Sequence, residues 1–283
     1  MQELEPAAGV LYLVGTPIGN LGDLSPRARR VLEGVDRIAC EDTRHSGLLL
    51  HQLGIRRPLL SFHQHNQTAR IPELLAALAA GESLALISDA GLPGISDPGE
   101  DLVAAVRQQG GTVICIPGPS AVTTALVSSG LPTGRFCFEG FLPPKATARR
   151  QRLQALAMEE RTLVLFEAPH RLLPLLEDLL ELFGDRPLRV ARELTKRHEE
   201  QVGPTVAAAL EHFRQRAPQG ECTLVLGGAT RAEPRQWPEA ELKRELRSLI
   251  EAQGCGSREA ARQLAERTGL PRRQLYALIH SED

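Results

Sequence analysis

Long hydrophobic runs are absent from this sequence of 283 residues. A membrane-spanning helix needs roughly 18 consecutive apolar residues, and no stretch of the chain approaches that length. The first residues, MQELEPAAG, are acidic and short, and they lack the basic start of a secretory signal. We therefore expect a cytoplasmic protein without a membrane span.

A large excess of charge of either sign is also absent. The chain carries 33 Lys and Arg against 35 Asp and Glu, a formal net charge of -2, so it has no global electrostatic footprint for nucleic acid. Its 42% hydrophobic residues are enough to bury one or two cores. The composition indicates an ordinary globular protein and excludes disordered and collagen-like chains.

Cysteine is scarce and odd in number, which argues against a disulfide framework. The five cysteines are scattered, mostly within apolar runs typical of strands: Cys40, Cys115, Cys137, Cys222 and Cys255. Small buried thiols of this kind suit a reducing compartment. We expect neither a disulfide nor a zinc site.

The first half of the sequence alternates regularly between strand and helix patterns. Short β-type runs are separated by amphipathic helical stretches, and they lie at residues 10–15, 37–40, 59–63, 84–89 and 112–118. This alternation predicts a first α/β domain at residues 1–119, with a mainly parallel sheet that helices cover on both faces. Functional sites in such sheets lie beyond the carboxyl ends of the strands.

The alternation is less strict after residue 119. Strand-like runs at 136–141, 162–167, 188–195 and 222–228 predict a second α/β domain at residues 120–229, with strands of mixed direction and a cleft between the domains. A polar linker that contains proline follows, and residues 235–283 have three short helical stretches. We expect a small all-α module there, similar to a helix-turn-helix. Its predicted features are a core of Leu264, Leu270, Leu275 and Ile279, a partial N-cap at Ser257 and a helix start at Pro271.

Two loops rich in glycine and proline are candidates for a ligand site. SDAGLPGISDPG, at residues 88–99, connects a strand to a helix where about 2–6 residues usually suffice, and PGPSA, at 117–121, ends the next strand. The glycines allow backbone to approach a ligand, and the prolines restrict the loops. At the ends of neighbouring strands, these loops would line one pocket. An extended surface loop is the alternative interpretation of residues 88–99.

The loop after the first strand, at residues 15–22, has glycines that invite comparison with a dinucleotide-binding loop. The dinucleotide fingerprint is G-x-G-x-x-G with the helix opening inside it. This loop instead has the spacing G-x-x-x-G-x-x-G, contains Pro17 and delays the helix to residue 25. We therefore do not predict a nicotinamide site.

Basic residues gather in one stretch of the second half. Between Gly140 and Met158 the chain has four cationic residues and no acid: Lys145, Arg149, Arg150 and Arg152. A solvated helix start would explain them, and so would a patch that contacts RNA phosphates. Arg272 and Arg273, at the start of the last predicted helix, are the residues of the C-terminal module best placed to contact phosphate.

Seven motifs, taken in order, carry a family resemblance: VGTPIGNLGD, CEDTRHS, SFHQHN, SDAGLPGISDPG, PGPSA, FEAPHRL and ARELTKRHEE. Between about residues 9 and 228 the chain resembles the tetrapyrrole methylase superfamily of class III methyltransferases. Within that superfamily it is similar to bacterial enzymes that methylate the ribose 2′-oxygen of a cytidine in the decoding region of 16S rRNA. SFHQHN and FEAPHRL separate this group from enzymes that act on corrinoid precursors.

The resemblance implies an S-adenosylmethionine-dependent rRNA 2′-O-methyltransferase. It also implies a homodimer that acts on 16S rRNA within the small ribosomal subunit, with the cofactor folded in the cleft. Carried over position by position, the cofactor residues would be Pro17, Asp89, Gly91, Leu92, Ser120 and Ala121, with Phe141, Ala168 and Thr223 from the second domain.

Methyl transfer to a ribose hydroxyl requires in-line positioning and benefits from a nearby base. Polar residues at strand ends of both domains could face one cleft: Glu41, Asp42, Arg44 and His63 from the first, and Arg171, Glu193 and Lys196 from the second. His45, His65, Glu167 and His170 are further candidates. A carboxylate or histidine could accept the proton, while Arg or Lys could hold phosphates or stabilise an alkoxide. His63 and His65 have no evident third ligand, so no metal site is predicted.

Two other functions are compatible with these residues. One is methylation of a tetrapyrrole such as a precorrin, and the other is a non-catalytic RNA-binding protein built on a methylase fold. The basic stretch and the C-terminal module argue against the first, because a small macrocycle needs neither. The apparently complete set of cofactor loops argues against the second.

Overall fold

The first half of the chain folds into the parallel sheet that its alternating pattern predicts. The computed structural model describes residues 6–230 and 237–280. Five strands pair in the order β3-β2-β4-β1-β5, and all of these pairings are parallel. They are β1 (Val10–Val14), β2 (Arg37–Cys40), β3 (Leu59–Ser61), β4 (Leu84–Ile87) and β5 (Thr112–Ile116).

Helices cover both faces of this sheet, because successive strand residues point to opposite sides. Tyr12 and Ile38 belong to a buried cluster with residues of α1 (Pro26–Gly34) and α2 (Thr43–Gln52). Leu11 and Leu86 pack on the other face with α3 (Gln67–Ala79) and α4 (Glu100–Gln108). A short 3-10 helix, η1 (Leu21–Asp23), lies in the loop after β1, and the hydroxyl of Ser25 caps α1 by accepting a hydrogen bond from Ala28 N–H.

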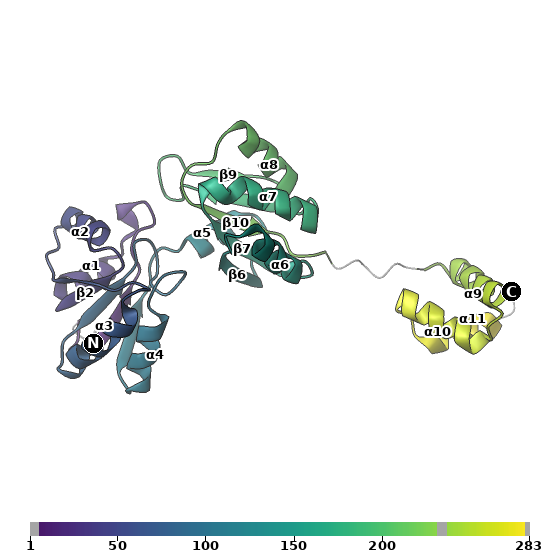
Figure 1. The fold of residues 1–283 in the computed structure, drawn as a ribbon, viewed down its shortest axis with the longest axis horizontal. Coiled ribbons are helices and arrows are strands. Elements are labelled where there is room, and N and C mark those ends of the chain that lie inside the picture. The colour runs from purple at the N-terminus through teal and green to yellow at the C-terminus, as the bar shows by residue number, and fades with distance from the viewer. Residues whose placement is uncertain (1–5, 231–236, 281–283) are drawn as a thin grey trace. The chain divides into compact units, whose positions relative to one another are not determined.

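The second half forms a mixed sheet, as predicted, and Figure 1 shows it in teal and green beside the purple and blue elements of the first. Its order is β6-β7-β10-β8-β9, in which β6 and β7 are parallel and the other pairs antiparallel. The strands are β6 (Phe136–Phe141), β7 (Thr162–Glu167), β8 (Leu188–Arg192), β9 (Glu200–Val202) and β10 (Cys222–Leu226). The sequence did not predict β9, because its three residues, EQV, form no apolar run.

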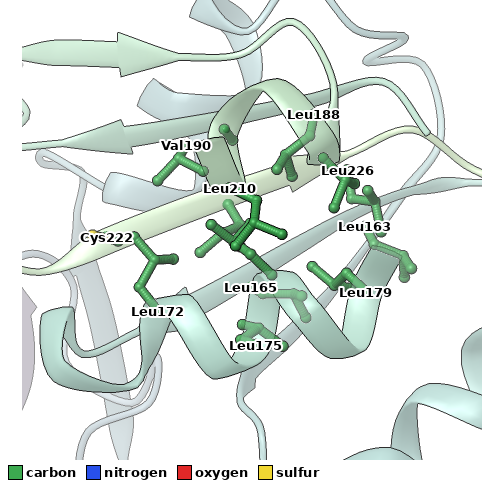
Figure 2. Packing of buried hydrophobic residues seen from close by; sticks show 14 of the residues in the cluster. Leu163, Leu165, Leu172, Leu175, Leu179, Leu188, Val190, Leu210, Cys222 and Leu226 are labelled. Carbon is green, nitrogen blue, oxygen red and sulfur yellow. The ribbon is translucent and has the colours of Figure 1, made fainter. Parts of the chain in front are cut away.

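The largest buried cluster lies on one face of this second sheet. Figure 2 shows Leu172, Leu175 and Leu179 of α7 (Pro169–Phe183) turned toward Leu163 and Leu165 of β7. The spacing of three and four residues puts these leucines on one face of the helix, and burial of each stabilises the fold by about 1.5–3 kcal/mol. The cluster also contains residues of α6 (Ala146–Leu156) and α8 (Val206–Gln215), while α5 (Ala121–Ser128) packs on a separate cluster with Val164 and Val225.

The chain divides into two compact units, residues 1–229 and 230–283. Both sheets belong to the first unit, and the boundary predicted at residues 119 and 120 stays a prediction. The second unit contains α9 (Glu239–Gln253), α10 (Ser257–Thr268) and α11 (Arg272–His280). Residues 235–236 and 281–283 of the predicted helical module lie outside the described residues.

The core of the helical unit is the predicted one. Leu264 and Leu275 are fully buried, and Leu270 and Ile279 pack against them. The predicted cap is wrong, because Ser257 is already the first residue of α10 and the cap position belongs to Gly256, which has no side chain to bond with.

The cysteines are less uniformly buried than predicted. Cys40 and Cys222 are buried, Cys137 and Cys255 are half-buried, and Cys115 is exposed. Cys115 lies on β5, which is an edge strand of the first sheet and is therefore covered on fewer sides. Among the described helices, none is both long and apolar enough to cross a membrane.

Candidate cofactor and catalytic site

A cavity of about 490 Å³ lies within the first unit, where loops of the first sheet meet elements of the second. Its volume is in the range of small-molecule sites, roughly 300–1,000 Å³. The first sheet contributes residues that follow β1, β2, β4 and β5, and these are the carboxyl ends at which a site is expected. The second sheet contributes Phe141 and Phe166, the segment after β8 and the segment that leads into β10.

The loop at residues 88–99 is held by hydrogen bonds to its own residues and to the loop after β1. The backbone N–H groups of Thr16 and Gly91 each donate to the other residue's carbonyl, over 2.9 and 3.2 Å. The hydroxyl of Thr16 donates to the carbonyl of Ser88 over 3.1 Å, and the hydroxyl of Ser88 donates to the carbonyl of Gly91 over 2.9 Å. The loop is therefore a fixed wall of the cavity.

Gly91 allows the loop to adopt a backbone conformation that favours glycine. Its φ of +87° is unfavourable for a residue with a side chain, and its N–H and carbonyl are both engaged with Thr16. Gly91 also lines the cavity, so close approach of its backbone to a ligand stays a prediction. A side chain there would strain the loop before it could obstruct the cavity.

The loops after β1 and β5 also touch each other. A Cβ atom on Gly15 would lie 2.7 Å from the Cα atom of Gly118, so only glycine fits at this crossing. The two ligand loops predicted from the sequence do not follow neighbouring strands, because β1 lies between β4 and β5. They still reach one cavity, since all three strands end at the same edge of the sheet.

The charged groups of the cavity are mainly carboxylates. Glu41, Asp89, Asp97, Glu193 and Glu221 line it, and Lys196 is the cationic residue in the described lining. Lys196 Nζ lies 2.9 Å from Glu193 Oε1, so that these two charges balance each other. Burial raises the pKa of Asp97 to about 7, with further contributions from the nearby Glu41, Asp89 and Glu221 carboxyl groups.

Two polar side chains in the cavity lack hydrogen bonds that such groups usually make within a protein. Asp89 Oδ1 is buried and has no hydrogen-bond partner in the described structure, which is a costly state for a carboxylate oxygen. Ser120 stands at the N-cap of α5, but its side chain makes no capping bond. Both groups are therefore available to a ligand.

Backbone strain is concentrated at the same place. Three described residues other than glycine have φ in the left-handed region: Ser96 at 58°, Glu193 at 52° and Thr195 at 65°. The first two line the cavity, and the third lies between Glu193 and Lys196. Strain of this kind clusters at functional sites, where the surrounding structure maintains it.

The remaining wall is apolar. The rings of Phe141 and Phe166 lie 5.5 Å apart at a tilt of 55°. With Ile18, Leu92, Ile95, Val122 and Leu194 they give the cavity a face suited to a flat heterocycle.

Most of the predicted cofactor residues line this cavity. Seven of them do so: Asp89, Gly91, Leu92, Ser120, Ala121, Phe141 and Thr223. Pro17 and Ala168 do not. Pro17 lies between Thr16 and the lining residue Ile18, and Ala168 is the N-cap residue of α7.

Three of the seven predicted catalytic residues line the cavity, namely Glu41, Glu193 and Lys196. Asp42 caps α2 by accepting a hydrogen bond from Arg44 N–H, and its carboxylate also pairs with the Arg44 side chain over 2.9 Å. That arrangement lowers the pKa of Asp42 to about 2, which makes it a poor proton acceptor near neutral pH. Neither Asp42 nor Arg44 lines the cavity, and a catalytic role for either stays a prediction.

Arg171 and His63 also lie outside the cavity lining. Arg171 Nη2 donates to the carbonyl of Leu142 over 2.7 Å and to the buried carboxylate of Glu167 over 3.2 Å, so it connects α7 to the segment after β6 and to the end of β7. His63 Nδ1 is buried without a hydrogen-bond partner, in the segment after β3. A catalytic role for either residue stays a prediction.

The predicted RNA patch is wrong at Arg149. Its side chain is only 8% exposed, and Nε lies 2.7 Å from Asp178 Oδ2. Arg150 also binds Asp178, over 2.7 Å, and Arg152 Nε binds Glu139 Oε2 over 2.9 Å. Acids from α7 and β6 therefore neutralise most of the patch, while Lys145 stays exposed.

The sequence analysis did not name Asp97 as a site residue, although it lies in the loop at residues 88–99 that was predicted to line a pocket. An acid in an unusually long loop after a buried strand was the available signal. No sequence signal marked Glu221 and Phe166 as site residues. They reach the cavity only because β10 pairs with β7, a contact between segments far apart in the sequence.

Comparison with known proteins identifies the scaffold. Residues 10–211 match the family described as Tetrapyrrole (Corrin/Porphyrin) Methylases. The chain belongs to this family. It is therefore an S-adenosylmethionine-dependent methyltransferase, as the sequence motifs predicted.

Its relatives include several proteins named Ribosomal RNA small subunit methyltransferase I. The one from Synechocystis is 55% identical over 271 residues, which are 95% of this chain and 97% of that protein. The one from Escherichia coli O157:H7 is 44% identical over 280 residues, 97% of this chain and 96% of that protein. The Thermotoga maritima relative is 48% identical over 220 residues, which are 78% of this chain but 99% of that protein.

Solved structures support the fold. A uroporphyrin-III-C-methyltransferase from Thermus thermophilus is 26% identical, with a TM-score of 0.56 over 78% of this chain and 95% of that one. A second structure from Thermus thermophilus, in complex with S-adenosyl homocysteine, is 21% identical, with a TM-score of 0.53 over 77% of this chain and 96% of that one. The predicted fold class is confirmed.

Proposed function

We propose that this chain transfers a methyl group from S-adenosylmethionine to the ribose 2′-oxygen of a cytidine in the decoding region of 16S rRNA. The observation that carries the proposal is the similarity to the rRNA small subunit methyltransferases, which runs at 55% identity over nearly the whole of both chains. The motifs that separate this group from corrinoid-modifying enzymes support the nucleotide and the ribose as targets.

The cavity fits the cofactor in charge and in shape. S-adenosylmethionine carries a sulfonium and an ammonium group against one carboxylate, and the carboxyl-rich lining suits its net positive charge. We propose that Asp89, whose Oδ1 lacks a partner, accepts a hydrogen bond from the ligand's amino or hydroxyl groups. The N-terminus of α5 at Ser120 suits the ligand's carboxylate, and the wall around Phe141 and Phe166 suits its adenine ring.

The bound cofactor supplies an activated methyl carbon whose bond to sulfur breaks with the electron pair remaining on sulfur. The protein must then position a ribose hydroxyl against that carbon and remove its proton. Glu41 and Glu193 are carboxylates within the cavity, and Lys196 is a cation there that can hold a phosphate or a developing alkoxide. The fold brings these groups together from the ends of β2 and β8.

The RNA would meet the protein around this cavity. Phe141 is 46% exposed at the cavity, and aromatic side chains of this kind can stack on bases. Lys145, four residues further along the chain, is the member of the basic stretch that stays exposed. Arg150, Arg152, Arg272 and Arg273 are exposed or half-exposed and stay candidate phosphate contacts.

We also propose a homodimer. Val127 on α5 is 71% exposed, and Phe136 on β6 is 38% exposed. Both are large apolar side chains on the second sheet and its helix, where a partner would bury them. Light scattering of the purified chain tests this, because a monomeric mass at micromolar concentration would contradict it.

A methyl-transfer assay with three acceptors tests the function. The purified chain would be incubated with S-adenosylmethionine labelled in its methyl group and with small ribosomal subunits, free 16S rRNA or a uroporphyrin-type tetrapyrrole. We expect label in RNA, recovered as 2′-O-methylcytidine after digestion to nucleosides, and less label with the Asp89→Ala variant when the cofactor concentration is below that variant's dissociation constant. Label only on the tetrapyrrole would favour the function of the Thermus thermophilus neighbour, and label on a base would refute ribose methylation.

A further inference from the structure

A tight turn after β8 brings Lys196 to the cavity. Glu193 and Thr195 in this turn have φ of 52° and 65°, in the left-handed region. The N–H of Lys196 donates to the carbonyl of Glu193 over 3.0 Å, and the N–H of Thr195 donates to the carboxylate of Glu199 over 2.8 Å. Strained backbone of this kind persists only where the surrounding structure fixes it. The backbone from which the Lys196 side chain extends therefore has a defined place.

The side chain of Lys196 lies against Gly19, in the loop after β1. A Cβ atom on Gly19 would lie 2.5 Å from Lys196 Cγ and 2.9 Å from Lys196 Cε, whereas carbon atoms in contact lie roughly 3.5–4.0 Å apart. The lysine stem therefore occupies the space that a side chain at position 19 would need. The glycine follows a strand of the first sheet and the lysine a strand of the second, so this contact joins the two walls of the cavity.

A second glycine, Gly220, makes room for the partner of Lys196. A Cβ atom on Gly220 would overlap with Glu193 Oε1, the same oxygen that accepts a hydrogen bond from Lys196 Nζ over 2.9 Å. Glycines from two separate segments therefore flank the Glu193–Lys196 pair, one beside each side chain. Larger residues at either position would displace one member of the pair.

The charge of Lys196 stands out among the groups of the cavity. It is the cationic residue of the described lining, and apart from its partner Glu193 the other charged groups there are the carboxyl groups of Glu41, Asp89, Asp97 and Glu221. These carboxylates repel a phosphodiester that approaches the cavity, and a cation offsets the repulsion only if it lies close to the phosphate. The Lys196 side chain is 44% exposed, so a ligand can reach it from solvent.

We propose that Gly19 and Gly220 are positioning residues that hold the Lys196 ammonium at the cavity, where it binds a phosphate of the RNA next to the ribose that receives the methyl group. An ammonium group has three donors, and Glu193 takes one of them in the described structure, so Lys196 can bind the phosphate without leaving its partner. The phosphate contact rests on the proposed function. The positioning of Lys196 does not, and the two parts are tested separately.

Nuclear magnetic resonance of the lysine side chains tests the positioning without any RNA. The chain has three lysines, Lys145, Lys196 and Lys243, so reductive methylation with isotope-labelled formaldehyde gives three lysine signals besides that of the N-terminal amine, and Lys→Arg variants assign them. The Lys196 signal should differ from that of the exposed Lys145, and Gly19→Ala should move it toward the Lys145 position. Unchanged signals of the other two lysines show that the variant is folded. Gly134→Ala is the matched control, because a Cβ atom there would meet no atom within 4 Å.

The same spectrum tests Gly220, with a control for backbone strain. Gly220 and Gly54 both have φ of 73°, but a Cβ atom on Gly54 would meet no atom within 4 Å. Gly220→Ala should therefore move the Lys196 signal, because it displaces Glu193, while Gly54→Ala should leave the signal in place. A Lys196 signal that stays at its wild-type position in both Gly19→Ala and Gly220→Ala would overturn the positioning.

Binding of small ribosomal subunits tests the phosphate contact, with S-adenosylhomocysteine present so that no turnover occurs. Lys196→Met should weaken binding roughly tenfold, the low end for a charged hydrogen bond because the side chain is half-exposed. The slope of log affinity against log salt should also become shallower by about 0.7, the value for one phosphate contact on single-stranded nucleic acid. Gly19→Ala should weaken binding by a smaller factor, about threefold, and Gly134→Ala should bind like wild type.

The double variant decides whether Gly19 acts through Lys196. Gly19→Ala combined with Lys196→Met should bind subunits within twofold of Lys196→Met alone, because residues that act through one contact are not additive. Additive losses, about thirtyfold in the double variant, would overturn that link. If the wild type labels ribose but Lys196→Met keeps the wild-type affinity and salt slope, the phosphate contact is wrong and the proposed function stands. If the wild type labels no ribose, the proposed function and the phosphate contact fail together, while the lysine spectrum still judges the positioning.

Discussion

Arg149 is the residue at which the sequence and the structure assign opposite roles, and one substitution decides between them. The Arg149→Met change removes the guanidinium but keeps most of the apolar stem, so it tests the ion pair with little loss of packing. The side chains of Arg149 and Asp178 are only 8% and 10% exposed. Breaking a buried pair of this kind destabilises a protein by about 3–5 kcal/mol. The lower end applies here, because Arg150 still binds Asp178 after the change.

A loss of about 3 kcal/mol should lower the melting temperature by about 6–12 °C in a unit of this size. Differential scanning calorimetry gives this shift, and Lys145→Met, at an exposed position of the same stretch, is the matched control with an expected change under about 2 °C. Folded Arg149→Met at low temperature should bind cofactor and ribosomal subunits like wild type. A shift below 2 °C combined with weakened subunit binding would refute the structural role and restore Arg149 to the RNA patch.

Three further changes have defined outcomes. Asp89→Ala removes the proposed charge-assisted contact, worth about 1.5–3 kcal/mol, so calorimetry should find S-adenosylmethionine bound about 10–150-fold more weakly. Unchanged affinity would remove Asp89 from the site. Asp97→Asn should raise the melting temperature more at pH 8 than at pH 5. The pKa of Asp97 is raised to about 7 in the folded protein, so the ionised carboxylate destabilises the fold, and this destabilisation grows from about pH 4 to about pH 7 and is complete above pH 7. An equal effect at both pH values would contradict that environment. Removal of the second unit, residues 230–283, should leave the cofactor affinity within twofold of wild type, because the cavity lies wholly in the first unit. The Thermotoga maritima relative likewise matches only 78% of this chain. Loss of cofactor binding would contradict this expectation.

Features that depend on neighbouring residues in the sequence could be predicted from it. The first sheet follows from alternating apolar runs, and Ser25 and Pro26 specify the start of α1 by their own chemistry. The loop at residues 88–99 could be recognised by its length alone. Seven of the nine predicted cofactor residues line the cavity. Five of these seven lie in SDAGLPGISDPG and PGPSA, the motifs whose loops form part of its wall.

Features that depend on contacts between distant segments were not predictable. The stretch with Arg149, Arg150 and Arg152 contains no acid in sequence, but Asp178 and Glu139 reach it from α7 and β6. Asp97 was missed for the same reason, because its environment depends on Glu41 and Glu221, which lie 56 residues before it and 124 residues after it in the chain. Gly91 was found as a site residue, although its conformation and not its lack of bulk explains it.

We propose above that this chain methylates a ribose of 16S rRNA with a cofactor held in the described cavity. Mapping of 2′-O-methyl positions in rRNA tests it most directly, in cells that lack the protein and in the same cells supplied with wild type or Asp89→Ala. We predict one cytidine in the decoding region of 16S rRNA whose ribose is methylated with the wild type, unmethylated in cells that lack the protein, and methylated to a smaller extent with Asp89→Ala. Identical methylation maps in all three, or a difference confined to a base, would contradict it.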